Sequence, residues 1–216
     1  MKRHIVFIIL AILLVIRVSA IELWNGFTTE MNREQIIAKA RTVLSVNEFN
    51  EYTGWSFTPF TNPNSDRLNF NDFPKTELVL QFKSPLNQYR KDVSNISFYL
   101  SNGYLFAVVV SFQAFIDDFL PVARNQYGQP MRTFVETNRG QRNNAFDPPF
   151  QRTWHGWLLP DKGILIPGQR LYQNAPQSRD NGLLYIYDRQ AVDKMYRERE
   201  EAAARRRTET TSGIQF

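Results

Sequence analysis

The residues best suited to chemistry lie in the stretch RTWHGWLLPDKG, residues 152–163. His155 stands there between Trp154 and Trp157, and no other histidine follows residue 20. An imidazole can act as a general acid or base near neutral pH, and indole rings provide large, partly polar contact surfaces for ligands. The stretch is therefore a candidate active site or ligand platform.

The same stretch has the composition of a β-strand, and this limits which side chains can act together. Alternate residues of a strand share a face, so His155 and Trp157 point one way while Trp154 points the other. The two tryptophans cannot form one platform around the histidine. We therefore keep His155 and Trp157 as candidate ligand contacts and assign no catalytic residue.

The remaining sequence lacks the combinations that other chemistries need. The chain has no cysteine, which excludes thiol nucleophiles and cysteine metal sites. A single histidine after residue 20 is too few for a metal site built from histidines. No G-x-S-x-G motif is present. Asp117 and Asp118 are adjacent, about 100° apart on a helix, and we interpret them as acids at a helix N-terminus. We expect no metal, no cofactor and no enzymatic activity.

The first 20 residues have the layout of a secretory signal peptide. Lys2 and Arg3 precede an apolar run at 5–16, and Val18-Ser19-Ala20 provides a cleavage site after Ala20. A 12-residue helix rises roughly 18 Å, which is short of the roughly 30 Å hydrocarbon core. We expect an exported protein, periplasmic or extracellular, with no membrane span after cleavage. Retention of the segment as an anchor is the alternative.

The positive net charge of +5 lies mainly outside the expected globular region. Residues 21–188 hold 16 Lys/Arg and 16 Asp/Glu, whereas the signal and the segment 189–216 carry the excess. A nucleic-acid-binding domain would concentrate basic residues on its folded part. We therefore exclude nucleic acid as a partner.

Two helices and a sheet are predicted for residues 21–188, which we treat as one globular domain. Asn32 and Gln35 form a capping-box pattern that begins a helix over 32–45. A second helix is expected over 114–127, interrupted or started by Pro121, with Phe115 and Val122 among its buried residues. Asn102-Gly103 predicts a tight hairpin turn. Strands are expected at 77–82, 94–101, 104–112, 131–136, 152–159, 163–168 and 183–188.

The segment after residue 188 differs in composition from the rest of the chain. Residues 189–207 are rich in charged residues and alanine, and only Val192, Met195 and Tyr196 offer an apolar face. Such a helix has little to bury, so we expect it to project from the domain. We expect residues 208–216 to be disordered. The whole chain is predicted to be α+β, with a mainly antiparallel sheet, two packed helices and a projecting charged C-terminal helix.

These expectations favour a non-enzymatic envelope or periplasmic protein that acts through contacts with another envelope protein. One alternative is a module that binds a carbohydrate or a small apolar ligand through surface aromatic side chains. A further alternative is a hydrolase that uses only carboxylates. The three differ in what the surface should present: an apolar patch, a pocket lined by rings, or paired carboxylates in a cleft.

Overall fold

The computed structural model describes residues 20–55, 76–83, 93–138, 149–172 and 180–212, and all structural statements refer to them. Residues 1–19, which form nearly all of the predicted signal peptide, lie outside this part. The same is true of the aromatic-rich segment 56–75 and of the last residues, 213–216.

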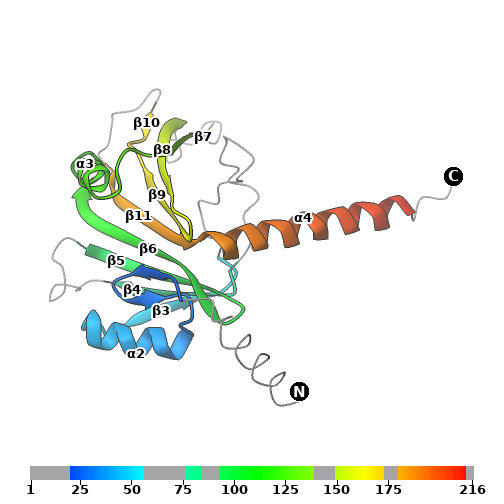
Figure 1. Ribbon diagram of the computed structural model, residues 1–216, viewed down its shortest axis with the longest axis horizontal. Coiled ribbons are helices and arrows are strands. Elements are labelled where there is room, and N and C mark those ends of the chain that lie inside the picture. The colour runs from blue at the N-terminus through cyan, green and yellow to red at the C-terminus, as the bar shows by residue number, and fades with distance from the viewer. Residues whose placement is uncertain (1–19, 56–75, 84–92, 139–148, 173–179, 213–216) are drawn as a thin grey trace, which may run out of the picture.

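A nine-stranded antiparallel sheet forms the centre of the molecule (Figure 1). Its order is β10-β8-β9-β11-β6-β5-β4-β3, and β7 pairs with β8. The short strands β1 (Glu22–Trp24) and β2 (Phe27–Thr28) form a separate two-stranded ribbon. The strands of the large sheet are β3 (Phe49–Tyr52), β4 (Leu78–Lys83), β5 (Val93–Ser101), β6 (Tyr104–Phe115), β7 (Arg132–Asn138), β8 (Phe150–Leu158), β9 (Lys162–Pro167), β10 (Leu171–Tyr172) and β11 (Asn181–Asp188).

The hairpin between β5 and β6 has the turn that its sequence predicts. Asn102 and Gly103 both adopt positive φ angles, 53° and 78°. A two-residue turn with φ > 0 at both positions matches the right-handed twist of the flanking strands. β6 is buried along most of its length and pairs with β5 on one side and β11 on the other, as expected for a central strand.

Helix α2 (Arg33–Val43) begins at the predicted capping box. The Asn32 side chain accepts a hydrogen bond from the Gln35 backbone, and the Gln35 side chain accepts one from the Asn32 backbone, both at 3.0 Å. The helix buries Ile36, Ile37 and Ala40. Residues at this spacing share one helical face, which explains why α2 packs its apolar side against the sheet.

Helix α3 (Ile116–Tyr127) differs in phase from the prediction. The helix starts at Ile116, so Phe115 occupies the N-cap position and its side chain is 37% exposed. Val122, predicted to be buried, is 57% exposed. Ile116 and Ala123 are the buried positions, because residues seven apart return to the same face of a helix. Pro121 is accommodated inside the first turns of the helix.

The apolar core has two parts, one on each face of the sheet. The larger cluster joins α2, α3 and the β1–β2 ribbon to one face and contains Phe27, Phe98 and Trp157. The smaller cluster lies on the opposite face and contains Tyr99, Trp154 and other residues of the alternate parity. Figure 1 accordingly shows α2 and α3 on one side of the sheet and α4 on the other.

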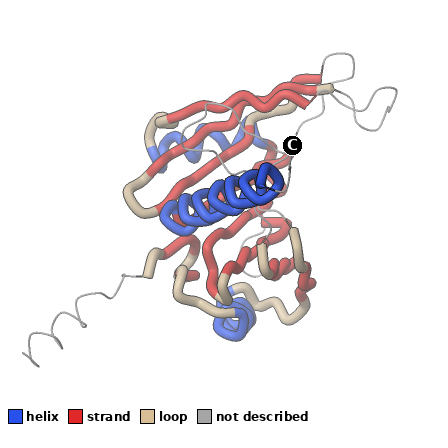
Figure 2. The backbone as a smooth tube through the Cα atoms, turned by 90° about the vertical axis from the view of Figure 1, so that its right-hand side faces the viewer, coloured by secondary structure: helices blue, strands red, loops and turns tan. Residues whose placement is uncertain are grey.

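Helix α4 (Arg189–Ser212) continues directly from β11. Val192 is 3% exposed in the smaller cluster, and Met195 packs partly buried beside it. Figure 2 looks onto the sheet from the side of α4, and the helix stands in front of the strands. The helix runs past its predicted end at residue 207, so residues 208–212 are helical rather than disordered.

The fold is therefore α+β, as predicted, and every strand pairing among the described residues is antiparallel. Within the same residues, no helix has both the length and the apolar composition needed to cross a membrane.

Candidate functional site

The two candidate ligand contacts named from the sequence lie in different environments. Trp157 is 1% exposed in the larger core cluster. Its indole Nε1 donates a hydrogen bond to the carbonyl oxygen of Gly128 at 2.9 Å, and its ring lies 6.1 Å from that of Tyr127. The tryptophan thus ties β8 to the end of α3, and its ring offers no surface to a ligand.

His155 is half-buried on β8, between its register partners Thr133 of β7 and Ile166 of β9. Burial lowers its pKa below the ordinary value, and the positive charge of Arg124 lowers it further. The imidazole therefore stays neutral at physiological pH. Its Nδ1 is buried and has no hydrogen-bond partner among the described residues, so none of them orients the ring through this nitrogen as a general base requires.

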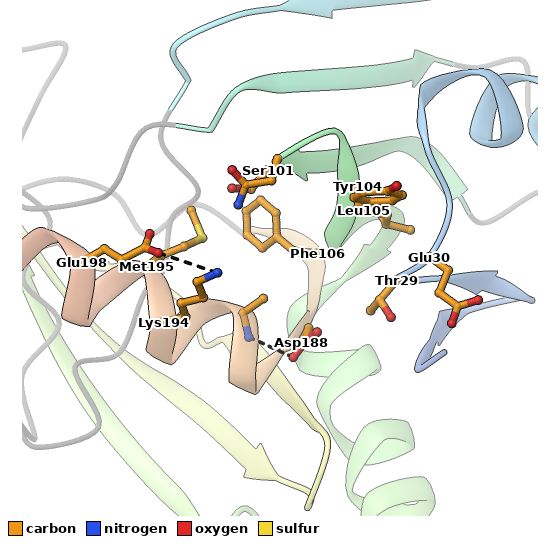
Figure 3. Close-up of a pocket in the computed structure, with 12 residues that line it drawn as sticks. Thr29, Glu30, Ser101, Tyr104, Leu105, Phe106, Asp188, Lys194, Met195 and Glu198 are labelled. Carbon is orange, nitrogen blue, oxygen red and sulfur yellow. Dashed lines mark hydrogen bonds and ion pairs between the residues drawn. The ribbon is translucent and has the colours of Figure 1, made fainter. Parts of the chain in front are cut away.

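A more suitable site is a pocket of about 580 Å³ at the base of α4, which we call the α4 pocket (Figure 3). Three separate segments line it: the end of β11 with the first turns of α4, the β5–β6 hairpin around its turn, and the residues between β2 and α2. Leu105 of the hairpin is held in place by a 2.9 Å hydrogen bond from its backbone N–H to the carbonyl oxygen of Met31.

The floor of the α4 pocket is apolar. Leu105 and Phe106 are each 2% exposed, and Met195 of α4 lies opposite them. Figure 3 shows the Phe106 ring at the centre of the pocket, with α4 on one side and Thr29 and Glu30 on the other. At the rim, Tyr104 leaves 55% of its surface exposed. Such a surface can accept an apolar side chain and stack against a ring.

The rim of the α4 pocket is mainly acidic. Glu30, Asp188 and Glu198 contribute three carboxylates, against the single ammonium group of Lys194. The Lys194 Nζ lies 3.7 Å from the Glu198 Oε1 as an exposed pair. The pocket therefore combines an apolar floor with an excess of negative charge at its edge, which favours an occupant that is apolar and positively charged.

Asp188 has a structural task in addition to its place on the rim. Its Oδ1 accepts hydrogen bonds from the backbone N–H groups of Gln190 at 2.8 Å and Ala191 at 3.1 Å. These are the first donors of α4, which lack partners inside the helix. The carboxylate thus fixes where α4 begins and how it leaves the sheet.

The sequence contained partial signals for this pocket. Asn102-Gly103 located the hairpin turn, and Met195 was recognised as part of the apolar face of the C-terminal helix. Nothing in the sequence indicated that this face covers Phe106, because the two residues are distant in the chain and meet only through the order of strands in the sheet. No pattern in the sequence indicates that Thr29 and Glu30 line a pocket.

Among the described residues, no group of three or more His, Asp or Glu side chains gathers in a way that would hold a metal ion. No known protein family matches the chain, and neither a curated protein nor a solved structure shows significant similarity to it.

Proposed function

We propose that this is an exported, non-enzymatic protein that binds a segment of another envelope protein in the α4 pocket. The observation that carries the proposal is the 580 Å³ pocket with an apolar floor and an acidic rim. The occupant that fits is a chain segment with an apolar side chain next to a lysine or arginine. The apolar group would contact Phe106 and Met195, and the cation would lie among the rim carboxylates.

Export is supported by the signal-peptide pattern and by the local structure just after it. The backbone N–H of Ile21 donates to the Thr29 hydroxyl at 3.2 Å, and the Thr29 N–H donates to the Ile21 carbonyl at 3.1 Å. Cleavage after Ala20 would leave both contacts in place. N-terminal sequencing of the protein from fractionated cells should therefore begin at Ile21, and a cytoplasmic protein that retains Met1 would overturn this part of the proposal.

The proposed arrangement of helices completes the binding surface. In it, α2 and α3 pack on one face of the sheet, and the charged C-terminal helix projects from the other. Support comes from Val192, which anchors the start of α4, and from residues 203–208, which are all exposed. A helix whose buried apolar residues lie in its first turns presents charged residues to a partner beyond the pocket.

A small ligand is the second candidate for the α4 pocket, because its volume lies within the range of roughly 300–1,000 Å³ that is typical of small-molecule sites. A carbohydrate or an amphipathic amine would use the Phe106 and Tyr104 rings. We do not propose a carboxylate-dependent hydrolase, since Asp188 caps α4 and Glu198 pairs with Lys194.

Photo-crosslinking in the native cells tests the proposal. A photoreactive phenylalanine in place of Tyr104 should yield a discrete adduct with one envelope protein. Leu171 is the matched control, because it is 60% exposed on β10 and does not line the pocket. Adducts of the same yield and pattern at both positions would contradict the proposal. A small molecule that copurifies with the protein, without any adduct at Tyr104, would favour the second candidate.

A further inference from the structure

A second cavity, of about 290 Å³, lies at the opposite end of β11 from the α4 pocket. Asp188, the last residue of this eight-residue strand, lines the α4 pocket, whereas Asn181 and Leu183 near its beginning line the second cavity. Eight strand residues span roughly 25 Å, so the two sites are separate. Two arginines also line the second cavity, Arg152 of β8 and Arg170 just before β10.

Arg152 is held rigidly by its surroundings. Its Nε donates to the Glu136 Oε2, which also accepts a 2.9 Å hydrogen bond from the Trp154 indole. The guanidinium carbon lies 4.5 Å from the Trp154 ring centroid and 5.7 Å from that of Phe150. Only 12% of the side chain is exposed. These contacts leave both Nη atoms of Arg152 without a hydrogen-bond partner among the described residues.

Arg170 approaches the same aromatic ring. Its guanidinium carbon lies 5.4 Å from the Phe150 centroid, and its Nη1 donates to the Tyr172 hydroxyl at 3.4 Å. Its Nε lies 3.7 Å from the Asp180 Oδ2, too far for a hydrogen bond, and is buried without one. That Asp180 oxygen instead accepts the Arg170 backbone N–H at 3.0 Å. The donors of Arg170 are therefore only partly used by the protein.

Asp180 also lines the cavity, with its carboxylate held by the Arg170 backbone, and the other polar groups of the lining are uncharged. The Ser111 hydroxyl donates to the Asn95 Oδ1 at 3.0 Å, which leaves the Asn95 amide as a donor. The Ser94 hydroxyl donates to the Ser111 carbonyl at 3.1 Å and keeps its oxygen as an acceptor. The cavity thus offers unused guanidinium and amide N–H groups together with a hydroxyl oxygen. Preorganised guanidinium groups with free N–H donors match a carboxylate, which accepts two parallel hydrogen bonds.

We propose that this second cavity binds the carboxylate group of a small, hydroxylated ligand such as a sugar acid. Arg152 and Arg170 provide the donors for the carboxylate, and Ser94 and Asn95 bind its hydroxyl groups. The volume suits a group the size of one monosaccharide, since it falls at the lower limit of the range for small-molecule sites. The site does not depend on the function proposed for the α4 pocket.

An NMR titration of the mature protein with three compounds tests this site. Glucuronate carries a carboxylate on a sugar, glucose is the same sugar without it, and N-acetylalanine carries a carboxylate like that of a peptide end. We expect saturable shifts at the Trp154 indole N–H with glucuronate and none with glucose. Saturation by N-acetylalanine alone would assign the carboxylate to a peptide end. No saturation by either acid, or equal binding of glucose, would overturn the proposal.

Two variants establish which residues hold the ligand. Arg170→Gln should weaken glucuronate binding about tenfold or more, the usual effect of losing a charge-assisted hydrogen bond. Its side chain is 40% exposed, so the variant should fold. Arg124→Gln removes an exposed arginine on α3 and is the matched control. Ser94→Ala, which removes only a hydroxyl, should weaken glucuronate more than N-acetylalanine. Unchanged affinity in Arg170→Gln would also overturn the proposal.

Discussion

The phenol ring of Tyr187 in β11 lies directly over Gly163, its register partner in β9. A β-carbon at position 163 would lie 2.1 Å from the Tyr187 Cζ and 2.4 Å from its hydroxyl oxygen. Any side chain at 163 would therefore displace this ring from the smaller core cluster. The glycine is required by its neighbour in the sheet and not by its own backbone angles.

Gly163→Ala should consequently lower the free energy of unfolding by about 1–3 kcal/mol, the usual cost of overpacking a core. Urea unfolding followed by tryptophan fluorescence measures it. Tyr187→Leu removes the ring, so the double variant should lose less than the sum of the two single losses. Strict additivity would show that the contact is not the cause.

Glu136 and Arg152 face each other across the β7–β8 ladder as a largely buried ion pair. Glu136→Gln should destabilise the protein by about 3–5 kcal/mol, because it leaves the guanidinium buried without its carboxylate. Thermal and urea unfolding provide the measurement. Glu34→Gln is the control, since Glu34 is 74% exposed beside Arg33 and its loss should change stability by less than about 0.5 kcal/mol. An equal loss of stability in the two variants would contradict the description of Glu136 and Arg152 as a buried ion pair.

The lowered pKa of His155 predicts a pH dependence of stability with a definite sign. The unfolded chain binds a proton with the ordinary histidine pKa of 6.5, whereas the folded protein binds it only at lower pH. The free energy of unfolding should therefore fall as pH drops below about 6.5 toward the folded pKa, and stay level above 6.5. In the His155→Gln variant, the free energy of unfolding should not show this decrease below pH 6.5.

The same histidine gives a direct readout, because it is the only one in a chain that begins at Ile21. NMR titration of its ring protons should give a pKa below 6.5. Arg124→Gln should raise that pKa part of the way, since burial, the larger cause, remains. A pKa at or above 6.5 in the unmodified protein would show that the imidazole is exposed.

Truncations of α4 should separate its anchored part from its charged part. Ending the chain after Ala204 removes only residues outside the core clusters, so the melting temperature should hardly change. Ending it after Arg189 removes Val192 and Met195, and should cost about 1.5–3 kcal/mol for each apolar side chain that was fully buried. Calorimetry of the two truncated chains measures the melting temperature of each. A large drop in melting temperature when the chain ends after Ala204 would mean that the charged segment is held by the domain.

Features with a local cause could be predicted from the sequence. The capping box at Asn32 and the turn at Asn102-Gly103 depend on residues within a few positions, and both have the expected geometry. The placement of Trp154 and Trp157 on opposite faces follows from strand alternation alone. In contrast, β10 has only two residues and forms because Leu171 meets Gln151 of β8, a pairing that no local pattern reveals.

The candidate sites depended on tertiary structure to a greater extent. Helix α3 starts at Ile116, and its buried face holds Ile116 and Ala123; Val122, predicted to lie in the core, is about 100° from Ala123 around the helix axis and is exposed. The α4 pocket arises where α4 crosses the β5–β6 hairpin, and the second cavity where Arg152 and Arg170 meet at Phe150. Strand order brings these residues together, and it is not encoded in the spacing of any motif.

The central claim is that the α4 pocket binds a partner segment through its acidic rim. The most direct measurement is the yield of the Tyr104 crosslink in Glu30→Lys/Glu198→Lys, compared with Glu34→Lys/Glu200→Lys. Both doubles reverse two exposed carboxylates, but only the first pair lines the pocket. We predict that the adduct disappears in the first and persists in the second. An adduct of equal yield in both doubles would contradict the claim.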